Sequence, residues 1–516
     1  MYHILWIDDE IDLLKPHILF LEKKGYKVVG INNGSDGIKY VEENSIDIVL
    51  LDEMMVGMDG LTVLKNIKLN DSDLPVVMIT KSEEESIFTE AIGSRITDFI
   101  TKPVSAIQVY LTIKKILESN KIIKETLARD YAKEFSYLSG ISDYNSETID
   151  FWYDLNERVF KKDIELDKFG NDSLRSSHKV VRNELNISFG KFVQKYYEDW
   201  IRGKDSPIMS NTVLDNYIKP SLKSGKKIFF IVIDSLRYDQ GLIINEILKE
   251  EVDSNLEQYL GVLPTTTSIA RNSIFSGKLP SGIDYEFPGF WENFFSNETS
   301  LNSREEELLL HYLNNNGLSS KSLEYYKIYR YNEGIKFENK IVRESNSDLV
   351  CLVYDILDFM LHSRNKTELL SELINNEKSF RSMIKSWFRN SSLFRIVLEM
   401  KKKGYEIIIT TDHGNIQVEK FTKTSADHFF TLGSRFRVGR NIKSSNKKQS
   451  WQVQVPQRIG LPSIFKGKNL IISKENNSLI NELSYEDFIN SVKGSYQHGG
   501  LSMEEALLPI ITIRSN

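Results

Sequence analysis

The segment IDIVLLD, residues 46–52, is an apolar run that ends in a carboxylate. Four more short apolar runs lie on either side of it: ILWI (4–7), YKVVGI (26–31), LPVVMI (74–79) and ITDFI (96–100). Amphipathic stretches separate these runs, and such alternation is typical of a parallel sheet with helices on both faces. Residues 1–119 are therefore predicted to form a flavodoxin-like α/β domain, which binds its ligand beyond the carboxyl ends of the strands.

Residues suited to phosphoryl chemistry close most of the predicted strands. Asp8 and Asp9 end the first strand, Asp52 the third, Thr80 the fourth and Lys102 the fifth. Because parallel strands end at one edge of their sheet, we expect these side chains to form one acidic pocket. Three carboxylates suit Mg²⁺, which prefers oxygen ligands. Asp52 is then the natural phosphoacceptor, with Lys102 offsetting charge and the Thr80 hydroxyl binding a phosphate oxygen.

A single Asp or Thr at a strand end is as readily a cap as a functional group. The ordered set, however, resembles the receiver domains of two-component response regulators, and Phe99, three residues before Lys102, matches their aromatic switch. The resemblance implies that a sensor histidine kinase phosphorylates Asp52 and that Thr80 and Phe99 then shift. It also implies that the fourth strand, fourth helix and fifth strand form a surface for homodimerisation.

The length of 516 residues exceeds what one hydrophobic core supports, so two or three domains are expected. Helical patterns with few Gly or Pro residues predict an all-helical middle domain over residues 120–219. At SGKKIFFIVIDSLRYDQG (224–241) the pattern changes to a buried strand. Similar runs at DLVCLVYDI (348–356), YEIIITTD (405–412) and ALLPIITI (506–513) predict a large second α/β domain over residues 220–516.

Composition excludes several classes of protein. No stretch approaches the ~18 apolar residues of a membrane span, and MYHILWIDDE (1–10) lacks the features of a signal peptide, so we expect a cytoplasmic protein with no membrane insertion. The net charge of −6 disfavours nonspecific binding to DNA, and no helix-turn-helix is recognisable after the receiver, so a promoter-binding regulator is the least favoured class. With Cys351 as the single cysteine, any zinc site must use His and carboxylates.

Three Asp and three His residues stand at or shortly after predicted strands of the second α/β domain. They are Asp234, Asp358, His362, Asp412, His413 and His498. This set is sufficient for two Zn²⁺ ions, and paired metals ~4 Å apart can stabilise both the attacking and the leaving oxygen of a phosphoryl displacement. Asp355 is an alternative to Asp358, although the four-residue spacing to His362 favours Asp358, and His428 is an unassigned candidate.

The nucleophile is expected in LPTTTSIARNSIFSG, residues 263–277. A cluster of threonines there precedes a predicted helix, whose free N–H groups favour an incoming phosphate. The order of strand-Asp, PTxT, DxxxH, DHG and HGG over residues 220–516 resembles the alkaline phosphatase superfamily, and most closely its PglZ type. The whole arrangement resembles PorX-type response regulators, which control type IX protein secretion.

The resemblance also implies roles for individual residues. Asp234, Asp412, His413 and the nucleophile would hold one zinc, and Asp358, His362 and His498 the other. Thr267 would be the nucleophile, as in the phosphodiesterases of the superfamily, with Thr266 as the fallback and Asn272 orienting the phosphate.

Two segments admit a binding and a structural interpretation. YYKIYRY (325–331) alternates basic and aromatic residues as a surface for single-stranded nucleic acid does, but we favour an amphipathic strand. RFRVGRNIKSSNKK (435–448) is a basic run of the kind usual in solvated loops, although a basic rim beside zinc would suit polyanionic substrates.

The favoured hypothesis is a regulator in which phosphorylated Asp52 controls a dizinc phosphodiesterase or phosphatase. Its substrate is expected to be a nucleotide or a short or cyclic oligonucleotide. The alternative is a non-catalytic regulator whose zinc-containing PglZ domain binds a sigma factor or components of the secretion system.

Overall fold

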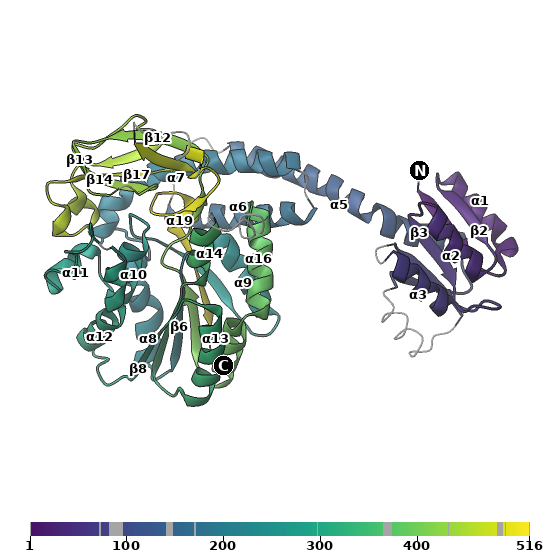
Figure 1. Ribbon diagram of the computed structural model, residues 1–516, viewed down its shortest axis with the longest axis horizontal. Helices are drawn as coiled ribbons and strands as arrows, with labels where there is room; N and C mark the ends of the chain where they lie inside the picture. Colours follow the sequence, from purple (N-terminus) through teal and green to yellow (C-terminus); the bar gives the residue numbers. More distant parts are fainter. Residues whose placement is uncertain are drawn as a thin grey trace. The chain divides into compact units, whose positions relative to one another are not determined.

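The computed structural model describes residues 2–71, 74–81, 96–140, 148–169, 172–296, 298–364, 374–431, 433–481, 489–490 and 492–514. The chain forms two compact units, Met1–Ala132 and Lys133–Asn516. The division between them falls within one long helix, α5 (Ala106–Gly140). Figure 1 labels the elements of both units.

The first unit contains a parallel five-stranded sheet in the order β2-β1-β3-β4-β5, the order of flavodoxin-like folds. Its strands are β1 (His3–Ile7), β2 (Lys27–Ile31), β3 (Ile48–Asp52), β4 (Val76–Thr80) and β5 (Asp98–Thr101). Its helical elements before α5 are η1 (Ile11–Leu14), α1 (Lys15–Lys23), α2 (Gly34–Glu43) and α3 (Gly60–Asn70). The predicted fold class and all five predicted strands are confirmed.

Local chemistry explains where these elements start and which faces they bury. The side chain of Asn33 accepts a hydrogen bond from the Asp36 N–H at the start of α2, and Asp59 does the same for Thr62 at the start of α3. Alternate residues of β3 enter separate hydrophobic clusters, so Leu50 packs on one face of the sheet and Leu51 on the other. Both faces are therefore covered.

The second unit begins with the helical middle region. After α5 come α6 (Ile149–Phe169) and α7 (Asp172–Ile201), followed by short turns of helix, η3 (Ser210–Thr212), η4 (Leu214–Ile218) and α8 (Lys219–Lys223). Trp152 of α6 and Phe189 of α7 belong to the same hydrophobic cluster as Tyr259 of the large sheet. The middle region is thus all-helical, as predicted, and shares a core with the domain that follows it.

A six-stranded mixed sheet forms the centre of the second unit, in the order β7-β20-β10-β6-β9-β8. Its strands are β6 (Ile228–Ile233), β7 (Asn255–Leu260), β8 (Leu323–Ile328), β9 (Leu349–Tyr354), β10 (Glu406–Thr410) and β20 (Leu507–Ile513). The four strands from β10 to β8 run parallel, and β20 runs antiparallel to both of its neighbours. Strand β6 is buried throughout, with Phe230 in one core and Phe229 in the other.

Helices cover both faces of this sheet (Figure 1). The helical elements in this part of the chain are α9 (Tyr238–Lys249), α10 (Thr267–Ser276), α11 (Pro280–Glu286), η5 (Glu298–Arg304), α12 (Glu305–Asn315), α13 (Tyr331–Glu344), α14 (Ile356–Arg364), α16 (Glu377–Asn390) and α17 (Ser392–Lys402). The helix α10 starts beside the carboxyl edge of the sheet and ends at Gly277, whose φ of 64° suits glycine.

Smaller sheets follow β10. Their strands are β11 (Ile416–Gln417), β12 (Lys420–Ser425), β13 (His428–Phe429), β14 (Phe436–Arg440), β15 (Lys443–Ser444), β16 (Ser450–Val453), β17 (Asn469–Ser473), β18 (Asn477–Asn481) and β19 (Tyr496–Gln497). The short helices here are η6 (Pro456–Ile459), η7 (Ser463–Phe465) and α19 (Met503–Ala506). Within the described part of the chain, no helix combines the length and apolar character that crossing a membrane requires.

Both ambiguous segments contain strands. The segment 325–331 contributes Tyr325 to Ile328 to β8, which confirms the strand interpretation. The expectation of a solvated loop at 435–448 is wrong at its start, because Arg435 and Arg437 are buried and flank Phe436 at the beginning of β14. Arg435 pairs with Glu505 inside the fold, so its charge is used internally.

Candidate functional site

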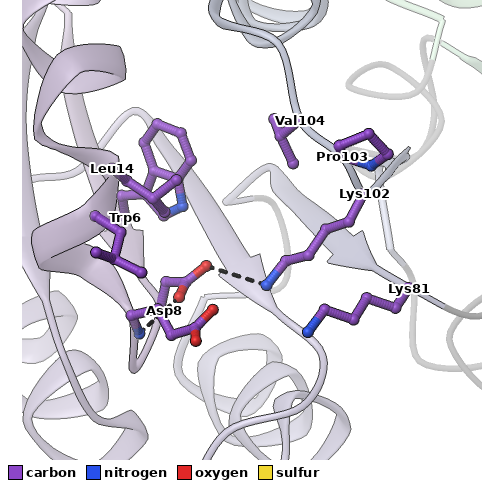
Figure 2. Close-up of a pocket in the computed structure, with 9 residues that line it drawn as sticks. Trp6, Asp8, Leu14, Lys81, Lys102, Pro103 and Val104 are labelled. Carbon is purple, nitrogen blue, oxygen red and sulfur yellow. Dashed lines mark hydrogen bonds and ion pairs between the residues drawn. The ribbon is translucent and has the colours of Figure 1, made fainter.

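The first candidate site lies at the carboxyl edge of the receiver sheet. Asp8, Asp9 and Asp52 each offer a carboxylate oxygen within 4.8 Å of the others. Lys102 Nζ lies 2.6 Å from Asp52 Oδ1 and 3.5 Å from Asp8 Oδ2. Figure 2 shows the side chain of Lys102 reaching the Asp8 carboxylate. The topology thus brings together residues that lie almost one hundred positions apart in the sequence.

Burial and like charge determine the electrostatics of this pocket. Burial raises the pKa of Asp52, and Asp8 and Asp9 raise it further, while the hydrogen bond from Lys102 opposes the shift. Burial alone would lower the pKa of Lys102, but the carboxylates of Asp52 and Asp8 raise it above its usual value. The pocket therefore has an excess of negative charge that a divalent cation would offset.

The remaining receiver candidates lie on the neighbouring strands β4 and β5. The Thr80 hydroxyl at the end of β4 donates a hydrogen bond to the Glu53 carboxylate. Glu53 is buried next to Asp52 and was not predicted, although the acidic pair at the end of β3 is visible in the sequence. Phe99 lies half-buried in β5, three residues before Lys102.

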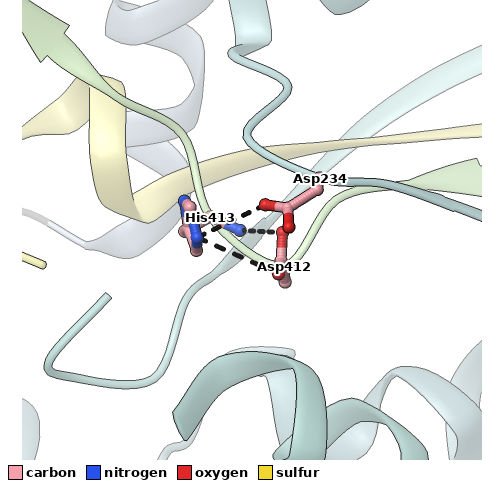
Figure 3. A group of neighbouring side chains, drawn as sticks. All are labelled: Asp234, Asp412 and His413. Carbon is pink, nitrogen blue, oxygen red and sulfur yellow. Dashed lines mark hydrogen bonds and ion pairs between the residues drawn. The ribbon is translucent and has the colours of Figure 1, made fainter. Parts of the chain in front are cut away.

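The second candidate site lies at the carboxyl edge of the large sheet. The register aligns Val232 of β6 with Thr410 of β10, so Asp234 and Asp412 follow their strands at the same level. Asp234, Asp412 and His413 each offer a ligand atom within 4.8 Å of the others (Figure 3). His413 Nε2 lies 3.5 Å from Asp234 Oδ1 and 3.9 Å from Asp412 Oδ2.

These two carboxylate oxygens have properties that favour a cation. Among the described residues, Asp234 Oδ1 and Asp412 Oδ2 are buried without a hydrogen-bond partner, and both face His413 Nε2. Burial raises the pKa of Asp234 well above its usual value, with Asp412 as the next cause. Burial also raises the pKa of Asp412. Oxygen and imidazole donors in this arrangement fit a metal such as Zn²⁺.

The threonine cluster stands at the start of α10, and its three members have different surroundings. Thr267 Oγ1 lies 2.9 Å from His413 Nε2. Thr266 is the residue preceding α10, and its hydroxyl lies 3.3 Å from that of Ser268. Thr265 donates to the Gly500 carbonyl and accepts from the Gly499 N–H. Only Thr267 among these three therefore has its hydroxyl beside His413.

The other group of predicted ligands is described in part. Asp358 Oδ1 lies 3.9 Å from His498 Nε2. The imidazole rings of His413 and His498 stack with centroids 4.1 Å apart, which brings the two groups together. His362 belongs to α14, but its side chain lies outside the part of the chain that the structure describes.

Arg271 is a buried cation in this site that the sequence did not reveal. Its Nη1 donates to Asp355 Oδ1 at 2.6 Å and to Asp234 Oδ2 at 3.1 Å. Its Nε lies 2.9 Å from Glu305 Oε1. A charged residue in the otherwise uncharged run SIARNSIFS (268–276) was the available signal. Asp355, weighed as an alternative ligand, is thus engaged by Arg271.

A cavity of about 600 Å³ opens onto the second site. Its walls include Asp234, Thr267, Asp358, His498, Arg271 and Asn302, and two largely exposed aromatic rings, Tyr329 and Phe359. Asn272 is fully buried and donates to the Ser268 carbonyl, and the residues that line the cavity do not include it. His428 lies exposed in β13, and it too is absent from the cavity wall.

Comparisons with known proteins agree with this organisation. Residues 4–114 match the response regulator receiver domain, residues 121–201 match the PorX response regulator linker domain, and residues 213–513 match the BREX system PglZ alkaline phosphatase-like domain. The last match spans more than half of the chain, which therefore belongs to the PglZ alkaline phosphatase-like family.

Curated relatives are similar to the receiver part. The uncharacterized transcriptional regulatory protein YkoG of Bacillus subtilis is 31% identical over 118 residues, which is 23% of this chain and 52% of that protein. The response regulator SaeR of Staphylococcus aureus is 32% identical over 123 residues, 23% of this chain and 53% of that protein. The chain thus spans about half the length of the curated relatives that it matches.

Among solved structures, a two-component response regulator from Clostridium difficile is 28% identical, with a TM-score of 0.22, over 23% of this chain and 97% of that one. The chemotaxis protein CheY4 of Vibrio cholerae is 21% identical, with a TM-score of 0.22, over 23% of this chain and 99% of that one.

The fold and the family matches define a two-component response regulator with an alkaline phosphatase-like effector domain. With the linker between the receiver and this effector domain, the domain order is that of a PorX-type regulator.

Proposed function

We propose that phosphorylation of Asp52 controls a dizinc phosphodiesterase in the PglZ domain. The proposal depends mainly on the position of the Thr267 hydroxyl, 2.9 Å from His413 Nε2 in a cluster with Asp234 and Asp412. These four residues would hold one Zn²⁺, through one nitrogen and three oxygen atoms. Asp358, His362 and His498 would hold the second, and the short distance between Asp358 and His498 supports this pairing.

The chemistry would begin at the Thr267 hydroxyl. Zinc bound at the site would lower the pKa of this hydroxyl and stabilise charge on the phosphoryl group. Thr267 Oγ1 would attack phosphorus, the bond to the leaving alcohol oxygen would break, and a phosphothreonine would form that water hydrolyses in a second step. Thr267 is the first residue of α10, and the positive end of a helix dipole favours a phosphate group at this position.

The cavity supports a nucleotide or oligonucleotide substrate, short or cyclic. The side chains of Tyr329 and Phe359 are 51% and 62% exposed and line the cavity that also contains Thr267. Aromatic rings of this kind stack on bases irrespective of their identity. We therefore favour a phosphodiester with a base attached over a simple phosphate monoester.

Regulation would start at the receiver. A sensor histidine kinase would transfer a phosphoryl group to Asp52, with Mg²⁺ bound by Asp8, Asp9 and Asp52, and Thr80 and Phe99 would shift as switch residues. Phosphorylation would promote homodimerisation; the predicted fourth helix of that surface lies outside the described residues. The PorX-type linker supports a role in regulating type IX secretion from the cytoplasm, with a sigma factor or secretion components as further partners.

The test of this proposal is a Thr267→Val variant with Thr266→Val as its matched control. Zinc-loaded wild-type protein should hydrolyse bis-p-nitrophenyl phosphate, and Thr267→Val should lose at least about 10³-fold in kcat, because it lacks the nucleophilic oxygen. Thr266→Val should retain most of the activity. Zinc content must be measured for each protein. Equal rates for wild type and Thr267→Val would overturn the assignment of the nucleophile, and a wild type without activity or zinc would favour a binding module.

A further inference from the structure

A network of buried charges connects the linker helices to the PglZ domain. Arg182 of α7 is 3% exposed and contacts three carboxylates. It donates to Asp163 of α6, its Nη2 lies 2.6 Å from Glu377 Oε2, and its Nε lies 3.1 Å from Glu504 Oε1. Glu377 and Glu504 belong to α16 and α19 of the PglZ domain. A single linker side chain therefore bridges two separate segments of that domain.

Glu504 connects Arg182 to the segments that contain His413 and His498. The next residue, Glu505, accepts a hydrogen bond from the Gly414 N–H through its carbonyl, at 3.1 Å, and from the Gly500 N–H through Oε1, at 2.8 Å. Packing here is tight, since a Cβ on Gly414 would lie 1.9 Å from the Glu504 carbonyl oxygen. A displacement of α19 would therefore move the backbone beside both histidines.

Glu377 connects Arg182 to the segment that contains Asp234. Its Oε1 accepts from Arg237 Nη1 at 3.0 Å, and Arg237 lies three residues after Asp234. Within this segment, the Ser235 N–H lies 3.4 Å from Asp412 Oδ1. Burial alone would raise the pKa of Glu377, but Arg182, Arg237 and Arg381 hold it well below its usual value.

We infer that Arg182 of the linker is a positioning residue for the candidate metal site, which makes the linker a structural part of that site. This inference rests on the proposed zinc function. Groups hydrogen-bonded directly to metal ligands set the orientation of those ligands, and their removal typically lowers metal affinity by about 10- to 100-fold. Arg182 contacts Glu377 and Glu504 and not a ligand itself, so a smaller loss of affinity is expected. Arg182 is part of α7, so a movement of this linker helix would displace Glu377 and Glu504 and, through them, the segments that contain the ligands.

The test uses the full-length chain and measures zinc affinity by competition with a fluorescent chelator. Arg182→Gln should weaken zinc binding by up to about 10-fold, the lower end of the range for direct partners of metal ligands. Arg182→Lys should recover part of the loss, because lysine keeps the charge. Lys179→Gln is the matched control, since Lys179 lies one turn earlier on α7 and pairs with Glu419 of the PglZ domain, not with Glu377 or Glu504. Its affinity should equal that of wild type.

A second readout separates positioning from loss of fold. The Co²⁺-substituted proteins should differ in visible absorption between wild type and Arg182→Gln, because the ligand geometry changes. If Arg182→Gln does not fold, the same two measurements are made on Asn186→Ala. Asn186 is uncharged and contacts the same segment, since it donates to Glu504 Oε2 and accepts from the Met503 N–H. Wild-type affinity and spectrum in folded Arg182→Gln, or in Asn186→Ala if Arg182→Gln is unfolded, would overturn the inference. A wild type that binds no zinc would instead overturn the proposed function.

Discussion

Replacement of Glu377 by glutamine should destabilise the second unit strongly. The Glu377 side chain is 13% exposed and lies 2.6 Å from Arg182 Nη2 and 3.0 Å from Arg237 Nη1, whose own side chains are almost fully buried. An amide can accept from one arginine, but its NH₂ group then faces the other. Breaking a buried pair by removing one charge costs about 3–5 kcal/mol, because the remaining charge stays buried without its partner.

Urea unfolding of the full chain in a Trp6→Phe background measures this cost. Trp6 is the one tryptophan of residues 1–132, so the remaining five report on the second unit. The matched control is Glu419→Gln, which breaks the half-exposed pair with Lys179 and should cost less than about 1 kcal/mol. If Glu377→Gln lowers the free energy of unfolding by no more than the control does, a stabilising role of the network is refuted.

The same comparison has a defined pH dependence. The pKa of Glu377 is lower in the folded chain than in the unfolded chain, so its contribution to stability is fully present above the unfolded value of about 4.3. That contribution is lost as the pH falls below this value towards the folded pKa. The difference in unfolding free energy between wild type and Glu377→Gln should therefore be constant from about pH 8 to pH 5.5 and decrease below about pH 4.3.

Two further predictions concern the proposed function. Asp52→Ala should abolish dimerisation induced by beryllofluoride in size-exclusion chromatography, because the acceptor carboxylate is lost; a dimer fraction equal to that of wild type would contradict the proposed switch. Tyr329→Ala and Phe359→Ala should each raise KM for a dinucleotide by about 5- to 150-fold, which corresponds to about 1–3 kcal/mol of base stacking. Neither substitution should change KM for a substrate without a base. An equal rise in KM for both substrates would argue against stacking.

The sequence by itself determined the receiver and most of its pocket. Short apolar runs alternate with amphipathic stretches, which predicts a parallel sheet and places Asp8, Asp52, Thr80 and Lys102 at the ends of its strands. The carboxyl ends of parallel strands meet at one edge of the sheet. The same argument predicted the proximity of Asp234, Asp412 and His413, because β6 and β10 are parallel neighbours. These results needed only local pattern and a topological rule.

Other features depended on tertiary structure. Arg271 contacts Asp234 and Asp355 because α10 packs beside the sheet edge, and no spacing in the sequence encodes that contact. The three threonines differ because each hydroxyl has a different partner, and some of these partners are distant in the sequence, such as Gly500 for Thr265. The position of Asn272 also depends on tertiary structure, because Asn272 lies on the side of α10 that is buried in the core.

The linker shows this difference most clearly. Its helices were predictable from the scarcity of Gly and Pro and from amphipathic periodicity. The buried network of Arg182 with Glu377 and Glu504 was not predictable, because these three residues lie more than one hundred positions apart in the sequence. A buried ion pair forms only when packing excludes water around both charges at once. Local sequence therefore determined the helices and strands and the acidic residues of the receiver pocket, whereas the tertiary structure decided which buried charges lie together behind the second site.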